Sequence, residues 1–172
     1  MQEVSEKLLK VVAAAEAKLR QISPDESLKS ILPGGWSRKQ VLGHLIDSAS
    51  NNHQRFVRAS LQESLDFPSY DQEGCVRVQA PHEAEWPLLI SLWGNYNRYL
   101  AHVIARLPAN KLETPCQIGK EASMTLRDVV GGISPTCFIT SAKWALQGKR
   151  RSAPSSSYAN LVVFSVCLLC IL

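Results

Sequence analysis

Two segments of this 172-residue chain repeat apolar residues at steps of three and four, which is the spacing of one face of an α-helix. They cover residues 3–22 and 86–107. A third segment, residues 37–61, begins with Ser37 and has Gln40 three residues later, a pairing typical of the capping box that starts a helix. The chain is therefore expected to fold mainly into long helices that pack their apolar faces together.

The segments between these helices contain residues that interrupt helices. Pro24 follows the first helix, and proline cannot continue a helical hydrogen-bond ladder. Residues 62–80 are expected to form a long irregular loop, and residues 109–124 a turn-rich stretch. Residues 125–130 have the pattern of an opening fourth helix.

Three amphipathic helices do not readily close a core, so a fourth must pack against them. We predict an all-α four-helix bundle over residues 1–131, with the 62–80 loop crossing between helices that are not neighbours. The fourth helix is expected to be atypical and incomplete, because Gly131-Gly132 and Ser134-Pro135 interrupt it. Residues 132–172 are interpreted as a divergent tail, with a basic and serine-rich linker before an apolar end.

The net charge of +4 lies entirely in this tail. All 15 acidic residues fall within residues 1–131, whereas residues 132–172 carry four basic residues and no acidic one. A basic surface spread over the folded part, which nucleic-acid binding requires, is therefore not expected. The five cysteines are an odd number in a chain too long to need a disulfide framework, which favours a reducing, cytoplasmic location.

Residues 158–172 are almost wholly apolar but fall short of the ~20 residues that a membrane-spanning helix needs. Two interpretations stay open: a buried apolar segment, or a membrane anchor with basic residues on its cytoplasmic flank. Cys167 and Cys170 form a C-x-x-C in this run, but no second ligand pair accompanies them to complete a metal site.

The second expected helix carries a polar stripe. At about 100° per residue, Ser48, Asn51 and Arg55 lie within about 40° of His44. Such a stripe can line a pocket inside a bundle, where facing helices build metal and ligand sites. The alternative is the solvated face of an amphipathic helix. His53 lies on the opposite side from His44, so the two cannot share an ion.

The sequence around His44 resembles the DinB/YfiT-like superfamily of metalloenzymes. The match is specific over residues 35–48, Gly-Trp-Ser-Arg-Lys-Gln-Val-Leu-Gly-His-Leu-Ile-Asp-Ser, with Asn51 or Asn52 and then Arg55 beyond. It is looser elsewhere and covers about residues 5–131. The later matching segments are Pro68-Ser69-Tyr70-Asp71 and Thr125-Leu126-Arg127-Asp128-Val129-Val130-Gly131.

The resemblance implies a four-helix bundle that holds a divalent metal, zinc or nickel, through three histidines. His44 matches the ligand on the second helix, and the other two belong to the last helix. The resemblance also implies a thiol-dependent transferase, isomerase or hydrolase type of activity on a small molecule. Asn51, Arg55 and Tyr70 would then lie near the substrate pocket.

The chain departs from the family after Gly131. Relatives continue with H-x-x-x-H or H-x-x-H-H, and in that register the two histidines fall on Thr136 and Thr140. Neutral hydroxyls are poor ligands beside imidazole, and a catalytic ion ordinarily needs three protein ligands. We therefore predict an incomplete site, and we hypothesise that a frameshift, altered splicing or a gene-model error replaced the tail.

Three interpretations of the function remain. The chain is a metal-dependent enzyme that takes its missing ligands from the tail cysteines or from a second chain, as in a homodimer. Alternatively, it is a non-catalytic bundle whose His44 stripe serves as a binding surface. The third interpretation is a bundle tethered to a membrane through residues 158–172.

Overall fold

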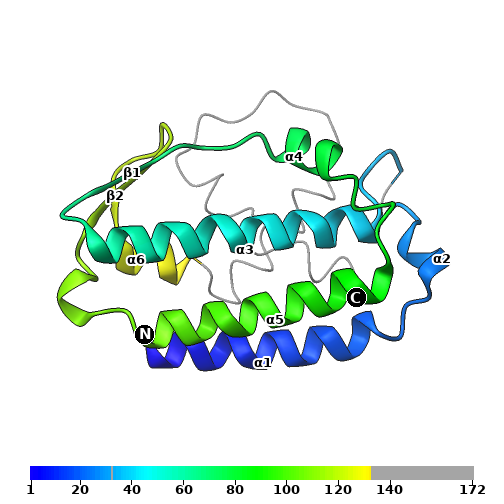
Figure 1. Cartoon of the computed structure of the whole chain (residues 1–172), viewed down its shortest axis with the longest axis horizontal. Helices are drawn as coiled ribbons and strands as arrows, with labels where there is room; N and C mark the ends of the chain where they lie inside the picture. Colours follow the sequence, from blue (N-terminus) through cyan, green and yellow to red (C-terminus); the bar gives the residue numbers. More distant parts are fainter. Residues whose placement is uncertain (32, 133–172) are drawn as a thin grey trace.

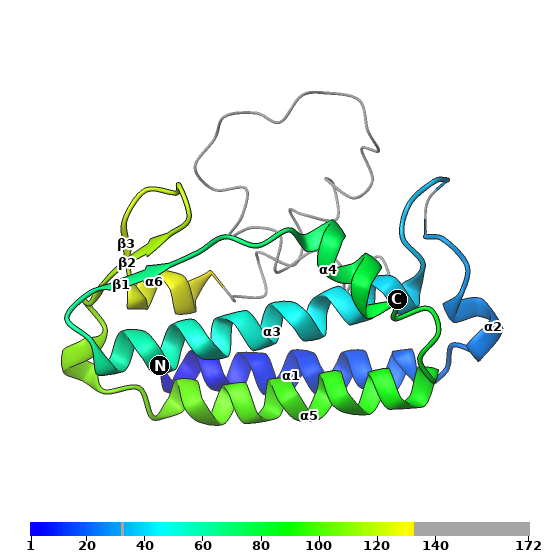
Figure 2. The ribbon, with the colours of Figure 1, turned by 45° about the horizontal axis from the view of Figure 1, so that its top comes forward.

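Three long helices dominate the computed structural model, which describes residues 1–31 and 33–132 (Figure 1). They are α1 (Gln2–Leu19), α3 (Arg38–Leu61) and α5 (Trp86–Ala105). α5 packs against both α1 and α3 and is the central helix of the three. Figures 1 and 2 show that α3 and α5 run in the same direction, whereas α1 runs in the opposite one.

A fourth helix, α6 (Leu126–Gly131), packs against α3. Its first turn is capped by reciprocal hydrogen bonds between Thr125 and Asp128, and its apolar side chains are buried. The predicted mostly helical bundle is therefore confirmed for the described residues. The predicted boundary after Gly131 lies at their edge, and the tail beyond Gly132 lies outside them, so both stay predictions.

A small three-stranded sheet at one end of the bundle was not expected from the sequence. It contains β1 (Leu65–Phe67), β2 (Pro115–Ile118) and β3 (Met124–Thr125) in the order β1-β2-β3. β1 pairs with β2 in parallel and β2 with β3 in antiparallel orientation. The turn η1 (Ala109–Lys111) precedes β2.

The irregular loop expected over residues 62–80 is wrong in two respects. The segment contains β1 and also α4 (Gln72–Gln79), whose first turn is capped by the Asp71 carboxylate. It also joins α3 and α5, which are direct neighbours. Because these two helices are parallel, the connection has to return along the length of the bundle, and that requirement explains its length (Figure 2).

The predicted helix starts agree more closely with the structure than the predicted helix ends do. Ser37 and Gln40 form the predicted capping box. α1 ends at Leu19, three residues early, because Ser23 caps the short helix α2 (Pro24–Ser27). One continuous apolar core joins the helices. Its fully buried members include Val12, Leu19, Leu42, Phe56, Ile90, Leu100, Ile104, Leu126 and Val130.

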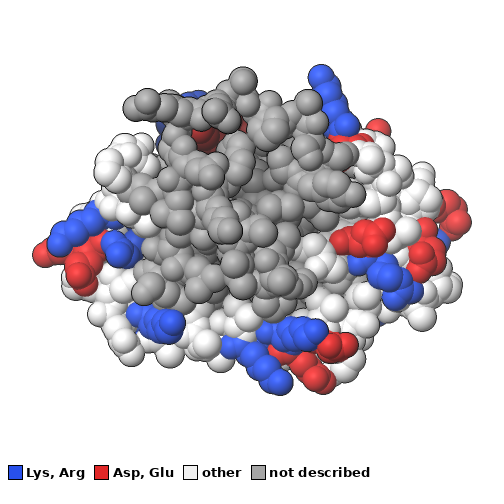
Figure 3. Space-filling model, turned by 180° about the vertical axis from the view of Figure 1, so that it is seen from behind, with Lys and Arg blue, Asp and Glu red and all other residues white. Residues whose placement is uncertain are grey.

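None of the described helices is both long and apolar enough to cross a membrane. The apolar run 158–172 lies outside the described residues. On the described surface seen in Figure 3, basic and acidic side chains lie close to one another around the molecule.

Candidate functional site

One face of α3 is polar and yet buried. His44 and Ser48 are each 1% exposed, Asn52 is 3% exposed and Arg55 is 6% exposed. These residues follow one another at steps of four, four and three, so they form one continuous stripe along the helix. The interpretation of this face as solvated is therefore wrong, because solvent does not reach these side chains.

His44 is the most unusual member of the stripe. Neither of its ring nitrogens has a hydrogen-bond partner among the described residues, although both are buried. The Trp36 ring lies against it, with the two ring centroids 5.3 Å apart. Burial lowers the pKa of His44 to about 4. The imidazole is therefore neutral near pH 7, which is the form that binds a metal.

Tyr70 approaches the stripe from the connection between β1 and α4. Its hydroxyl lies 3.1 Å from the Ser48 hydroxyl, within hydrogen-bond distance. Burial is the main cause that raises the pKa of Tyr70, and the charge of Asp47 raises it further. The phenol is therefore protonated at neutral pH and can donate a hydrogen bond.

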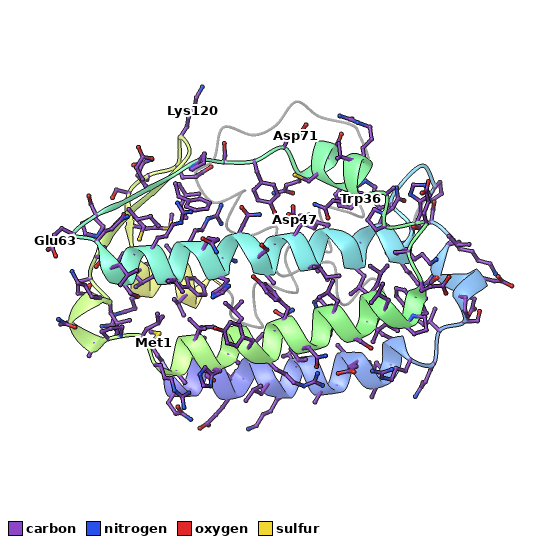
Figure 4. All side chains as sticks on the ribbon, viewed as in Figure 1. Met1, Trp36, Asp47, Glu63, Asp71 and Lys120 are labelled. Atoms are coloured by element: carbon purple, nitrogen blue, oxygen red, sulfur yellow. The ribbon has the colours of Figure 1, made fainter. Side chains whose placement is uncertain are left out.

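Asp47 and Cys75 lie near Tyr70. Burial, together with the charge of Asp47 and a hydrogen bond to it, raises the pKa of the Cys75 thiol. One carboxylate oxygen of Asp47 is buried without a hydrogen-bond partner among the described residues. Figure 4 shows Asp47 on the side of α3 that faces α4, the side on which Trp36 and Asp71 also lie. Polar groups of α3 and of the α3–α5 connection thus meet there.

Arg55 ends the stripe as a buried cation. Its Nη1 donates a hydrogen bond of 3.0 Å to Asn52 Oδ1, and its guanidinium carbon lies 5.2 Å from the centre of the Phe67 ring. Its Nε has no partner, and no acidic side chain in the described part of the chain forms an ion pair with it. Burial lowers the pKa of Arg55, but a guanidinium remains charged at physiological pH.

The structure separates the predicted pocket residues into two groups. His44 and Arg55 lie on the buried face of α3, and half-buried Tyr70 contacts that face through Ser48. Asn51 is also half-buried but donates to the Asp47 carbonyl of its own helix. Asn52 is the amide that supports Arg55. Its position three residues before Arg55, on the same helix face, was the available signal for this role.

Gly43 allows the α3–α5 connection to lie directly against α3 beside His44. A Cβ atom at Gly43 would overlap the ring of Pro81, which follows α4. This close approach requires glycine, since any other residue would displace the connection. The residue before His44 thus fixes one wall of the site.

The described residues do not supply a complete metal site. Among them, no group of three His, Cys, Asp or Glu side chains lies close enough to hold an ion. His53 is directed elsewhere, with its Nδ1 3.1 Å from the Tyr96 hydroxyl. Thr136, Thr140 and the tail cysteines lie outside the described residues. The residues present therefore do not fit the three-ligand ion that the family resemblance implies.

The fold and the buried α3 face define a four-helix bundle with a polar interior site. No family model and no curated protein matches the chain. Among solved structures, the fold is similar to that of YfiT from Bacillus subtilis, with a TM-score of 0.63 over 74% of this chain and 75% of that chain, at 20% identity. YfiT is described as a probable metal-dependent hydrolase with an unusual four-helix bundle topology. The four-helix bundle fold that the family resemblance implies is thereby confirmed.

Proposed function

We propose that residues 1–132 carry one half of a metal-dependent hydrolase site, in which His44 is a ligand of the ion. The observation that carries this proposal is the burial of His44, neither of whose ring nitrogens has a partner among the described residues. A buried polar group without a partner costs free energy, about 1–3 kcal/mol. An ion bound to one nitrogen would offset that cost. The likeness to YfiT supports the metal-dependent class.

The ion-binding centre is incomplete over the described residues, because no group of three His, Cys, Asp or Glu side chains lies together among them. We therefore expect the chain as it stands to bind a divalent cation weakly. Free Cys75 and Cys116 agree with a reducing compartment such as the cytoplasm.

Arg55 indicates the chemical class of the substrate. A buried cation without a counter-ion is costly, and an anionic ligand group would pair with it. Asn52 accepts a hydrogen bond from the guanidinium, and the protonated Tyr70 hydroxyl, which lies against the same face of α3, can donate a further one. We therefore propose a small molecule with a carboxylate or similar anionic group. A thiol that carries a carboxylate would also agree with the family resemblance.

Titration of the full chain with zinc or nickel chloride, followed by calorimetry, tests the role of His44. We expect weak binding that His44→Ala abolishes. His53→Ala is the matched control, because it removes a histidine from the same helix that is already bonded to Tyr96. Binding that is unchanged in His44→Ala would overturn the assignment of His44 as a ligand.

A second candidate function is a non-catalytic module that binds small anions. Two observations among the described residues favour it: Arg55 forms no ion pair with an acidic side chain, and no three-ligand group is present. Calorimetry separates the two candidates. If a small carboxylate binds to the metal-free chain and no cation binds, the non-catalytic module is the better description.

A further inference from the structure

α6 begins as a well-formed bundle helix and is directed along α3. Its capping box is complete, and Leu126, Val129 and Val130 are buried. Figures 1 and 2 show it beside the carboxyl-terminal half of α3, running toward the half that carries His44. A longer helix in this direction would face the His44 ring. The sequence instead continues with a second glycine, Gly132, and then Ser134-Pro135, residue types that disfavour a helix interior.

The amino-acid sequence itself restricts what the neighbouring reading frames can encode. For most amino acids, all codons share their first two bases and differ only in the third. The amino-acid sequence therefore fixes most bases of the coding sequence and leaves the third base of each codon undetermined. A second frame reads the third base of one codon with the first two bases of the next. Across Pro135 and Thr136 this frame reads a codon ending in AC, which encodes histidine, tyrosine, asparagine or aspartate.

The next codons in this frame permit further histidines at a spacing that suits one face of a helix. Across Phe138 and Ile139 it encodes histidine or tyrosine, and across Ile139 and Thr140 it encodes histidine, tyrosine or asparagine. Two codons separate the first histidine-compatible codon, across Pro135 and Thr136, from the second, across Phe138 and Ile139. They encode only apolar residues: leucine, methionine or valine across Thr136 and Cys137, and leucine or phenylalanine across Cys137 and Phe138. The frame therefore permits H-x-x-H-H with apolar residues at both x positions.

The remaining frame excludes this pattern. There, the codon across Phe138 and Ile139 encodes leucine or serine, and the codon across Ile139 and Thr140 encodes leucine, serine or a stop. Only one of the two alternative frames can therefore supply a histidine pair at these positions.

The register of α6 places such histidines on its buried face. Numbered by the second codon of each pair, the histidine-compatible positions are 136, 139 and 140. At about 100° per residue, positions 136 and 140 lie within about 20° of Val129, which is buried in the described helix. Positions four apart lie on the same helix face, one above the other. They would therefore face the interior in which the His44 nitrogens lack partners.

We infer that the reading frame of this chain shifts near Gly132. The adjacent frame beyond that point encodes a continuation of α6 that carries histidines. The residues printed from about 133 onward are then the product of a one-nucleotide shift, and the missing partners of His44 are encoded in the adjacent frame. This inference accounts for the loss of acidic residues after Asp128 and for the disagreement between His44 and the incomplete ligand set. It rests on the proposed function only for the claim that these groups bind an ion.

The first test reads the codons of this chain. We expect the codons of Pro135, Phe138 and Ile139 to end in cytosine, because only CCC, TTC and ATC place histidine at all three positions of the adjacent frame. A Pro135 or Ile139 codon that ends in a base other than cytosine would remove the histidine at position 136 or 140, which both family patterns require, and would overturn the inference.

The second test compares the full chain with the chain translated after one nucleotide is added behind the Gly132 codon. Elemental analysis of both purified proteins is expected to find about one zinc or nickel ion per restored chain and far less in the chain as it stands. In the restored chain, His44→Ala should remove the ion and His53→Ala should retain it. If the codons are as expected and the restored chain binds no metal, the reading-frame inference stands and the proposed metal site fails.

Discussion

His44 is the buried titratable group through which pH most directly affects stability. Burial holds its pKa at about 4, below the ordinary value of 6.5, so the unfolded chain takes up a proton more readily than the folded one. The contribution of the neutral His44 ring to the free energy of unfolding is therefore complete above about pH 6.5 and is lost as the pH falls toward 4. The two pKa values correspond to a loss of about 3 kcal/mol.

Urea unfolding of chelator-treated protein between pH 7 and pH 4 measures this effect. The free energy of unfolding of the unaltered chain should fall by about 3 kcal/mol more than that of His44→Gln, which has no titrating ring. Equal pH dependence in the two proteins would show that the ring is not buried in its neutral form.

Arg55 is the residue whose replacement tests the anionic ligand. Arg55→Met removes the buried cation, so a small carboxylate that stabilises the unaltered chain should no longer raise its Tm. At a concentration of about 100 times the Kd, the stabilisation of the unaltered chain is expected to be about 2.7 kcal/mol. Arg58→Met is the matched control, because Arg58 also lies over the Phe67 ring but is exposed. A carboxylate that stabilises Arg55→Met as well would place the anion elsewhere.

The sequence showed which polar residues share one face of α3, but it did not show whether that face is buried. Helical spacing was enough to place His44, Ser48 and Arg55 on one face. The same spacing could not tell a buried face from a solvated one, because burial depends on what packs against the helix. It also favoured Asn51 over Asn52, because Asn51 lies closer to His44 around the helix. The spacing did not show that Asn52 is buried and Asn51 only half-buried, since burial depends on tertiary packing.

At the level of the elements, the contact between Gly43 and Pro81 decides how closely the α3–α5 connection lies to the site. Gly43→Ala should gain about 1 kcal/mol of helix propensity but lose about 1–3 kcal/mol by overpacking against the Pro81 ring. We therefore expect a net loss in the free energy of unfolding, measured with denaturant.

Gly131→Ala is the matched control for this prediction. Gly131 also lies in a helix, but no atom of the described residues lies within 4 Å of the Cβ that alanine would add. It should be neutral or stabilising, by up to about 1 kcal/mol. If both substitutions stabilise the chain equally, Pro81 does not restrict Gly43.

The elements that sequence analysis predicted well are those defined by local signals. The helix start at Ser37 was predicted because the capping box involves residues only three apart. β1 was missed because it is three residues long and pairs with Cys116 and its neighbours, which lie far away in the sequence. Short strands paired over such distances have no local signature, since their stability comes from tertiary context.

At the scale of the molecule, the topology brings two further segments against α3, the helix that carries His44. The α3–α5 connection returns over the bundle and brings Tyr70 and Pro81 to one side of α3. α6 packs against the same helix. The described part of α6 ends at Gly131, and the ligand set is incomplete in the same region of the chain.

The charge distribution of the whole molecule leads to a last prediction, about nucleic acid. Residues 1–131 have no net charge, and the excess of +4 comes from Lys143, Lys149, Arg150 and Arg151. Binding to DNA should therefore be weak, sequence-independent and limited to these four cations. Each phosphate contact contributes about −0.9 to the slope of log K against log salt concentration, so the slope should be no steeper than about −4. Replacing Lys149, Arg150 and Arg151 with glutamine should leave a slope near −1 in a filter-binding assay. A steeper slope that persists after these replacements would show that the helical bundle itself binds the backbone.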